Sequence, residues 1–215
     1  MSLYTPSHFS TQDRAAIARL MHEYSFATLV TPAAPEPLVS HLPLLLVPGC
    51  EPHGTLLGHF ARANPHWQHA RAVESIAIFH GPHAYVSPSW YAEPDRMVPT
   101  WNYASVHAHG TLEMIDDPAS ARGVMDALVQ RFEGPRAEPW TFQRGERERN
   151  ALMGAIQPFR MRIRRIDAKF KLSQNRSRDD RSRVIDALRA EGHPEAGATA
   201  DWMANYAGRD DDGPR

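Results

Sequence analysis

With 215 residues, 42% of them hydrophobic, the chain is long enough to bury a core, and 24 basic against 25 acidic residues give it a formal net charge of -1 at pH 7. That balance excludes a general attraction to nucleic acid or anionic lipid, so either partner would need a local basic patch. Cys50 is the only cysteine, which excludes an internal disulfide. The longest apolar run, LPLLLVP, is far shorter than the roughly 20 residues that span a bilayer, and the N-terminus lacks a signal-peptide pattern. We therefore expect a cytoplasmic protein without a membrane partner.

The first predicted element is an amphipathic helix in residues 10–25, with Ser10 as its N-cap and apolar residues at helical spacing. Five or six strands follow, because short stretches rich in β-forming residues alternate with proline and glycine. These stretches are FATLVT, PLVSHLPLLLV, GTLLGHFA, SIAIFHG and PTWNYASVHAHGTLEMI.

Two helices are predicted next, in residues 117–133 and around residues 146–156. The stretch FRMRIRRI, residues 159–166, then returns to strand periodicity, with apolar residues inward and arginines outward. A terminal helix is predicted in residues 177–192, and the stretch GRDDDGPR at 208–215 is predicted to be a disordered acidic tail.

This order of elements indicates a mainly β fold with peripheral and C-terminal helices, built as a single domain over residues 1–207. A small antiparallel barrel suits it, because closure removes exposed strand edges. The outward residues Arg160, Arg162 and Arg164 form the one basic stripe in the pattern. Such a stripe either contacts nucleic-acid phosphates or pairs with nearby acids, for which Glu146 and Glu148 are candidates.

The stretch HFARANPHWQHA, residues 59–70, runs from a predicted strand into a short helix. Asn64 is the expected N-cap and Pro65 the first helical residue. A helix N-terminus offers free N–H groups and a partial positive charge, and His59 and Arg62 come just before it. The pattern predicts a phosphate-binding site; the alternative is that Arg62 pairs with an acid and the helix start has no ligand.

Pro43 lies in the middle of the predicted strand PLVSHLPLLL, where its missing N–H would interrupt a strand ladder. A flat ligand lying along this backbone, beside Ser40 and His41, would explain the interruption. An ordinary bulged edge strand would explain it equally well.

The stretch VPTWNYASVHAHG, residues 98–110, alternates as a strand does but carries unusual faces. One face holds Trp101, Tyr103, Ser105, His107 and His109, and the other holds Asn102, Ala104, Val106 and Ala108. Neither face has the composition of a plain core. The pattern alone leaves open what this strand lies against.

Known catalytic and metal-binding motifs are missing from the sequence. The twelve histidines include two closely spaced pairs, but one cysteine and no second ligand cluster argue against a metal site. No G-x-S-x-G, G-x-G-x-x-G or G-x-x-x-x-G-K-[ST] pattern occurs, which leaves nucleophilic hydrolysis and nucleoside triphosphate chemistry without support.

Six stretches of the chain, taken in order, carry a resemblance. They are YTPSHF (4–9), SHLPLLL (40–46), ARANPHW (61–67), FHGPHAYVSPSWY (79–91), VPTWNYASVHAHG (98–110) and KLSQNRS (171–177). Together they resemble the PaiB family, also called FMN-binding negative transcriptional regulators, over nearly the whole chain. The resemblance implies a pyridoxamine-phosphate-oxidase-like split barrel: six antiparallel strands, a homodimer, and FMN in a cleft between the two subunits.

The resemblance also implies roles for individual residues. Trp101 would pack against the isoalloxazine ring, and Asn102 would bond its polar edge. Arg62, the helix start at Asn64, and Lys171 would bind the phosphate. The complete predicted set is Ser40, His41, Leu42, Pro43, His59, Arg62, Asn64, Trp101, Asn102, Lys171 and Gln174. Alternatively, Trp101 and Tyr103 only anchor the dimer interface.

Two functions remain open at this stage. In the first, FMN is a structural or sensing ligand of a negative transcriptional regulator, although no helix-turn-helix supports direct DNA binding. In the second, the protein is an FMN-dependent oxidoreductase, such as a flavin reductase or a pyridoxamine-phosphate-oxidase-like enzyme, in which the protein orients the cofactor. A third, weaker alternative is a split barrel that binds haem.

Overall fold

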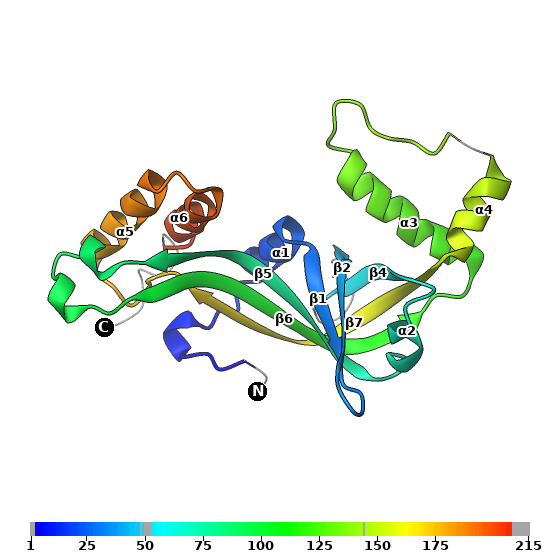
Figure 1. The fold of residues 1–215 in the computed structure, drawn as a ribbon, viewed down its shortest axis with the longest axis horizontal. Helices are drawn as coiled ribbons and strands as arrows, with labels where there is room; N and C mark the ends of the chain where they lie inside the picture. The colour runs from blue at the N-terminus through cyan, green and yellow to red at the C-terminus, as the bar shows by residue number, and fades with distance from the viewer. Residues whose placement is uncertain (1–2, 48, 50–52, 144, 208–215) are drawn as a thin grey trace. The chain divides into compact units, whose positions relative to one another are not determined.

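The computed structural model describes residues 3–47, 49, 53–143 and 145–207 (Figure 1). The chain divides into two compact units. Unit 1 comprises residues 1–24, 80–106 and 167–215, and unit 2 comprises residues 25–79 and 107–166. Each unit gathers segments that are far apart in the sequence, so the units are not consecutive domains. The predicted tail and Cys50 lie outside the described residues.

Within the described residues, seven strands form one sheet in the order β2-β1-β5-β6-β7-β4-β3. Their bounds are β1 Phe26–Thr31, β2 Leu38–Pro43, β3 Leu45–Val47, β4 Thr55–Ala61, β5 Glu74–Val86, β6 Thr100–Met114 and β7 Ile156–Lys171. The pairs β1–β2, β1–β5, β3–β4 and β4–β7 are antiparallel. Strands β1 to β4 belong to unit 2, whereas the long strands β5, β6 and β7 contribute residues to both units (Figure 1).

The strand predicted around Pro43 is two strands, which makes the predicted count of six wrong. Pro43 is the last residue of β2 and pairs with Phe26 of β1, whereas Leu45 begins β3 and pairs with Leu57 of β4. Between them, the N–H of Leu44 donates to the carbonyl of Ser25 at 2.8 Å. Since proline has no N–H, it suits the point at which the chain leaves one partner for another. The two ends of the strand order, β2 and β3, are thus adjacent in the sequence, with only Leu44 between them.

The core of unit 2 follows the predicted alternation of β7. Phe159, Met161 and Ile163 are fully buried, and Phe159 packs against Phe60 of β4 with ring centroids 4.9 Å apart. Gly110 of β6 permits a close strand approach, because a Cβ there would lie 2.0 Å from the carbonyl oxygen of Arg162. Full burial of side chains of this size stabilises a fold by about 1.5 to 3 kcal/mol each.

Unit 2 also carries three helices, α2 His66–His69, α3 Pro118–Glu133 and α4 Glu146–Gly154, and the last two confirm the sequence prediction. Asp117 caps α3, because its carboxylate accepts from the N–H of Ser120 at 2.8 Å. Ion pairs from Arg149 to Asp126 and from Arg122 to Glu146 join α3 to α4.

Unit 1 holds the remaining parts of β5, β6 and β7 with the helices α1 Arg14–Glu23, α5 Arg178–Ala190 and α6 Pro194–Ala207. Three short 3₁₀ turns, Ser7–Phe9, Pro88–Trp90 and Pro94–Arg96, complete it. The first predicted helix is confirmed, although its cap is Asp13 and not Ser10, because the Asp13 carboxylate accepts from the N–H groups of Ala15 and Ala16.

Helix α6 was not predicted. Gly192, at φ +67, ends α5 in the left-handed conformation that glycine tolerates, and Pro194 at once begins a new helix. The buried residues Trp202 and Tyr206 of α6 pack edge-on against Phe170 of β7, at centroid distances of 5.5 and 5.1 Å.

Candidate functional site

A chain of buried polar side chains lies in unit 2, at the start of α2. His66, only 2% exposed, lies between two hydroxyls: its Nδ1 is 2.8 Å from Ser40 Oγ and its Nε2 is 2.8 Å from Thr31 Oγ1. Thr31 Oγ1 is in turn 2.7 Å from Ser75 Oγ, and Asn64 Nδ2 donates to Ser40 Oγ at 3.0 Å. Burial lowers the pKa of His66, so the ring is neutral at pH 7, and one nitrogen donates while the other accepts. Two predicted site residues, Ser40 and Asn64, are therefore brought together and held by an internal network.

Asn64 also organises the start of α2, one residue later than predicted. Its Oδ1 accepts from the N–H of His66 at 3.0 Å, and Pro65 occupies the N-cap position rather than the first helical position. The helix is a single turn that ends at His69.

Arg62, predicted at a phosphate, is engaged by main-chain carbonyls. Its Nε donates to the oxygen of Gly154 and its Nη2 to the oxygen of Ile156, both at 3.0 Å. Its guanidinium carbon also lies 5.9 Å from the centroid of the Trp67 ring. The alternative partner in the sequence analysis was an acid, whereas the structure gives neutral oxygens at the end of α4. These two hydrogen-bond acceptors carry no formal charge.

The other predicted residues of unit 2 differ in exposure. His41 is exposed, and its Nδ1 lies 3.2 Å from Thr28 Oγ1, whereas Leu42 and Pro43 are half-buried. His59 of β4 has a buried Nδ1 with no hydrogen-bond partner among the described residues. Burial lowers the pKa of His59. A buried ring nitrogen without a partner is uncommon in proteins and is a place where a ligand can bond.

A second group of predicted residues lies in unit 1, around a pocket of about 130 Å³. Its lining residues are Phe9, Tyr91, Val98, Thr100, Asn102, Lys171, Ser173, Asn175 and Arg176, and none of them is acidic. The Nζ of Lys171 donates to Thr100 Oγ1 at 2.7 Å and to the carbonyl oxygen of Trp101. Burial lowers the pKa of Lys171, and repulsion from Lys169 and Arg176 lowers it further. A group of cations without a lining carboxylate favours an anionic ligand.

Asn102 and Gln174 are occupied within unit 1. Asn102 is 1% exposed, and its Nδ2 donates to Ser173 Oγ at 2.9 Å. Gln174 holds the turn after β7, because its Oε1 accepts from the N–H of Leu172 at 2.8 Å and its Nε2 donates to the carbonyl of Phe170. Asn102 thus lines the pocket beside Lys171, whereas Gln174 holds the turn that follows and is not among the lining residues, which sequence spacing alone did not show.

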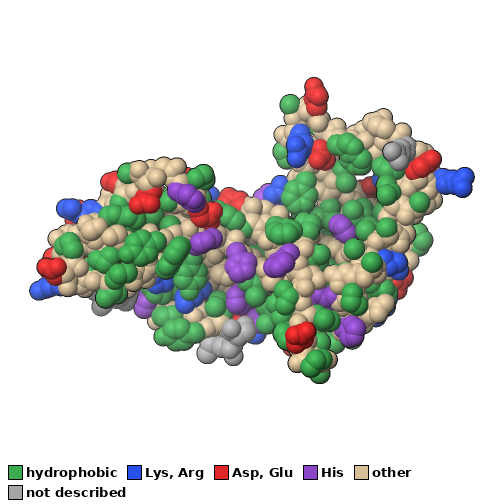
Figure 2. Space-filling view, viewed as in Figure 1, with side chains coloured by type: hydrophobic (Ala, Val, Ile, Leu, Met, Phe, Trp, Pro, Cys, Tyr) green, Lys and Arg blue, Asp and Glu red, His purple; other side chains and the backbone are tan. Residues whose placement is uncertain are grey.

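The two faces of β6 are unlike each other. Asn102, Ala104, Val106 and Ala108 are all buried, so the expectation that neither face is plain core is wrong for this one. On the opposite face Trp101 is 53% exposed, and its ring lies 6.2 Å from the ring of Tyr85 and 6.2 Å from that of His83. Figure 2, which has the same viewpoint as Figure 1, shows hydrophobic side chains in green and histidine side chains in purple on the surface of the molecule.

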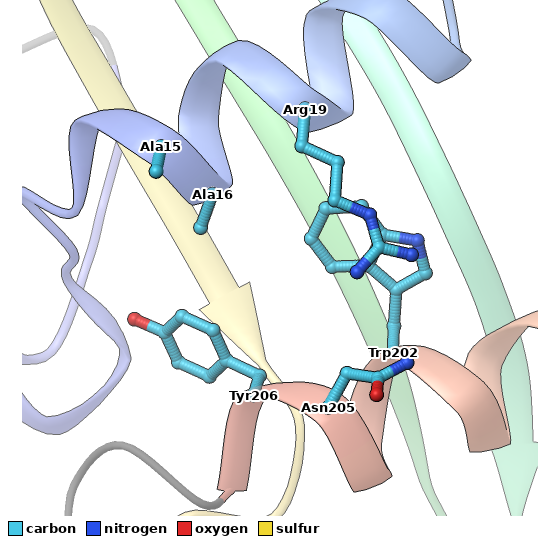
Figure 3. Close-up of a pocket in the computed structure, with 6 residues that line it drawn as sticks. All are labelled: Ala15, Ala16, Arg19, Trp202, Asn205 and Tyr206. Atoms are coloured by element: carbon cyan, nitrogen blue, oxygen red, sulfur yellow. The ribbon is translucent and has the colours of Figure 1, made fainter.

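A second pocket in unit 1, of about 260 Å³, lies between α1 and α6 (Figure 3). Arg19 lies over the Trp202 ring, 4.8 Å from its centroid, and pairs with Glu23 at 2.7 Å. The indole Nε1 of Trp202 donates to Glu23 at 3.2 Å. The polar groups of Arg19, Glu23 and Trp202 thus bond to one another. We attribute this pocket to the packing of α1 against α6.

Arg160 and Arg164, two of the three outward arginines of β7, pair with acids on other strands of the sheet and not, as suggested above, on α4. Arg160 pairs with Glu113 of β6, and this contact lowers the pKa of Glu113. Arg164 pairs with Glu74 of β5 at 2.6 Å. The basic stripe is therefore partly neutralised within unit 2.

Neither a metal cluster nor a membrane-spanning helix is present in the part of the chain that the structure describes. No three or more His, Cys, Asp or Glu side chains there lie close enough together to hold a metal ion. No helix there has the length and apolar character needed to cross a bilayer.

A family model described as "Putative FMN-binding domain" matches residues 3–165. The chain belongs to this family. "Protease synthase and sporulation protein PAI 2" of Bacillus subtilis (strain 168) is 34% identical over 204 residues, which cover 94% of this chain and 96% of that protein. FMN is thus the cofactor of this family member, as the sequence predicted.

Solved structures show the same fold at low sequence identity. The FAD- and haem-binding protein of Mycobacterium smegmatis matches with a TM-score of 0.58 and 18% identity, over 75% of this chain and 73% of that one. The flavocytochrome Anf3 of Azotobacter vinelandii matches with a TM-score of 0.59 and 12% identity, over 75% of this chain and 69% of that one. The predicted split-barrel class, mainly β with flanking helices, is confirmed, with seven strands rather than six.

Proposed function

We propose that this protein is a flavin-binding regulator of the PaiB type, which binds FMN at a homodimer interface and acts as a negative transcriptional regulator. The observation that carries the flavin part is the acid-free pocket around Lys171 and Arg176. The regulatory part is supported by the family resemblance and by the near full-length similarity to PAI 2, whose name refers to protease synthesis and sporulation. FMN, when bound, supplies an isoalloxazine ring that accepts and donates one or two electrons.

The phosphate of FMN is proposed to bind in the unit 1 pocket. A phosphate monoester carries about 1.5 to 2 negative charges at pH 7 and offers strong acceptor oxygens. Lys171 and Arg176 would donate to those oxygens, and the hydroxyls of Thr100 and Ser173 line the same pocket. Lys169 and Arg176 repel the charged Lys171, and a bound dianion would offset this repulsion among the three cations.

The ring is proposed to contact Trp101, whose exposed indole offers a large flat surface. A second set of proposed FMN contacts lies on unit 2. It comprises Ser40, His41, Leu42, Pro43, His59 and Asn64; Arg62 is left out of this set, because its guanidinium already donates to two main-chain carbonyls. The buried Nδ1 of His59 is the observation that favours this set, because a polar edge of the ligand would give it a partner.

The proposed dimer is supported by the exposed aromatic group at Trp101 and Tyr85. Large exposed apolar side chains that contact one another are typical of interaction surfaces. A sedimentation experiment at micromolar concentration should give a dimer, and a monomer would contradict the proposal.

Flavin titration tests the proposal directly. FMN should bind at least about tenfold more tightly than riboflavin, since only FMN offers the phosphate. Equal affinities would contradict the phosphate pocket, and a Soret band in the purified protein would favour haem in place of flavin.

The regulator and the oxidoreductase can be separated by two measurements. Direct DNA binding should weaken steeply across a salt series in a gel-shift, because phosphate contacts release counterions. Rapid anaerobic bleaching of the bound flavin by NADH or NADPH, with no DNA binding, would favour the oxidoreductase and overturn the regulator.

A further inference from the structure

The largest of the three pockets described lies in unit 2. It shares no lining residue with the Lys171 pocket of unit 1. It has a volume of about 550 Å³, which falls within the range of small-molecule sites. Its lining residues are Arg62, Ile115, Asp116, Pro118, Ala121, Arg122, Asn150, Met153, Gly154, Ile156 and Pro158. Helices α3 and α4, which Figure 1 shows together, provide about half of them.

Most of this lining is apolar. The side chains of Ile115, Ala121, Met153 and Ile156, together with two prolines, form walls against which a hydrocarbon or aromatic body can pack. Burying such a body gains roughly 25 cal/mol for each Å² removed from water. An entirely apolar ligand would, however, leave the two arginines of the lining without a function.

The charge of the lining is positive. Among the described lining residues Asp116 is the only acid, and the two oxygens of its carboxylate are already occupied: Gln157 donates to Oδ1 at 3.2 Å, and Arg71 lies 3.5 Å from Oδ2. No contact among the described residues pairs Asp116 with either arginine of the lining, and the acid near Arg122 is Glu146, which lies outside the lining at 3.7 Å. An anionic group on the ligand would therefore meet net attraction.

The two arginines differ in how firmly they are held. Arg62 is fixed by its hydrogen bonds to Gly154 and Ile156, which position the end of α4 at the pocket wall. Among the described residues, the contacts of Arg122 are long, 3.4 Å to Asn150 Oδ1 and 3.7 Å to Glu146 Oε1. Contacts of this length are weak, so Arg122 can exchange them for a ligand.

We propose that this pocket binds a small amphipathic monocarboxylate, with the apolar body against α3 and α4 and the carboxylate on Arg122. Arg62 is a positioning residue that sets the wall and adds positive charge. A monocarboxylate suits the pocket better than a phosphate ester, because the apolar lining favours a ligand with one small charged end and a larger apolar part. Such a ligand would be an effector or substrate that accompanies FMN.

The test uses 2-naphthoate as the probe and 2-naphthamide as its uncharged match, titrated calorimetrically into FMN-saturated protein and repeated on flavin-free protein. Naphthoate should bind at least about tenfold more tightly than naphthamide, and Arg122→Gln should remove that preference. Met153→Trp, which fills the pocket, should abolish binding of both probes. Arg149→Gln is the matched control, because Arg149 joins the same two helices through Asp126 but does not line the pocket.

Three results would overturn the proposal: no naphthoate binding, equal affinity for the two probes, or full naphthoate binding by Arg122→Gln. Loss of FMN on addition of naphthoate would also contradict it, because the probe would then occupy the flavin site. Circular dichroism of each variant shows that it is folded. Since the flavin-free titration is independent of FMN, failure of the flavin proposal leaves this test intact.

Discussion

Lys171 in unit 1 and Arg62 in unit 2 are both cations that the sequence places at a phosphate, and their surroundings are opposite. Lys171 is half-buried beside Arg176 and Lys169, in a pocket lined by no acid. Arg62 is exposed and donates to two main-chain carbonyls at the end of α4. Clustered cations favour the binding of an anion. A cation that donates to the free carbonyls at a helix end instead stabilises the fold. The comparison predicts that substitution of Lys171 weakens FMN binding much more than substitution of Arg62 does.

The largest effect is expected for Lys171→Met. Charge-assisted hydrogen bonds contribute about 1.5 to 3 kcal/mol, so FMN binding should weaken by roughly ten- to a hundredfold. Riboflavin affinity should stay nearly constant, because riboflavin has no phosphate. Flavin fluorescence titration measures both ligands. Arg183→Met is the matched control, a cation of unit 1 that pairs with Asp179 outside the pocket.

Lys171→Arg sharpens this prediction. A guanidinium keeps the charge but has a different shape, so part of the FMN preference should return. Equal losses for FMN and riboflavin in Lys171→Met would instead show that the residue supports the ring pocket or the fold, and the comparison with Arg62 would then fail.

The next effect is expected for Trp101→Ala. Truncating an exposed aromatic anchor of an interface costs about 2 kcal/mol or more, which corresponds to roughly thirtyfold in affinity. Both dimerisation and FMN binding should weaken, as measured by sedimentation and flavin titration. Trp140→Ala is a close control, because Trp140 has a similar exposure, 54%, but lies in unit 2. A Trp101→Ala variant that stays dimeric and binds FMN as tightly as the parent would exclude the proposed role.

A smaller effect is expected for Arg62→Ala. Loss of two hydrogen bonds from a charged donor should lower the free energy of unfolding by about 1 to 2 kcal/mol, visible in urea denaturation. The preference for FMN over riboflavin should change much less than in Lys171→Met. If the preference instead falls tenfold or more, Arg62 lies at the phosphate, as the sequence alone predicted.

Local patterns predicted the fold well, and contacts between distant segments explain where prediction stopped. The alternation of Phe159, Met161 and Ile163 fixed which face of β7 is buried, because strand periodicity is a local property. The change of partner after Pro43 was not predicted, since it depends on β1 and β4 together. The cofactor followed from ordered motifs, whereas the partners of Arg62 are carbonyls more than 90 residues away, and main-chain acceptors leave no trace in side-chain composition.

The smallest effect is expected for the pH dependence of stability that His66 contributes. His66 also contrasts with Lys171 in its charge. Burial is the main cause that lowers the pKa of each residue, but at pH 7 His66 is neutral whereas Lys171 is a cation. Between the lowered pKa of His66 and its ordinary value of about 6.5, the unfolded chain binds more protons than the folded chain. The free energy of unfolding should therefore be unaffected by this group above about pH 6.5 and should fall as the pH drops toward the lowered pKa. Urea denaturation from pH 8 to pH 5 measures this slope.

His66→Gln removes the titrating group while keeping an amide that can both donate and accept. The slope should become shallower, and the remainder should come partly from His59, whose pKa burial also lowers, so His59→Gln with His66→Gln should flatten it further. Each unit by which a pKa is lowered corresponds to about 1.4 kcal/mol once the pH is below both values, which bounds the effect of one histidine. An unchanged slope in His66→Gln would mean that Ser40 and Thr31 accommodate the protonated ring. The network at the start of α2 would then be a site that tolerates charge, as the Lys171 pocket does, and not a neutral one.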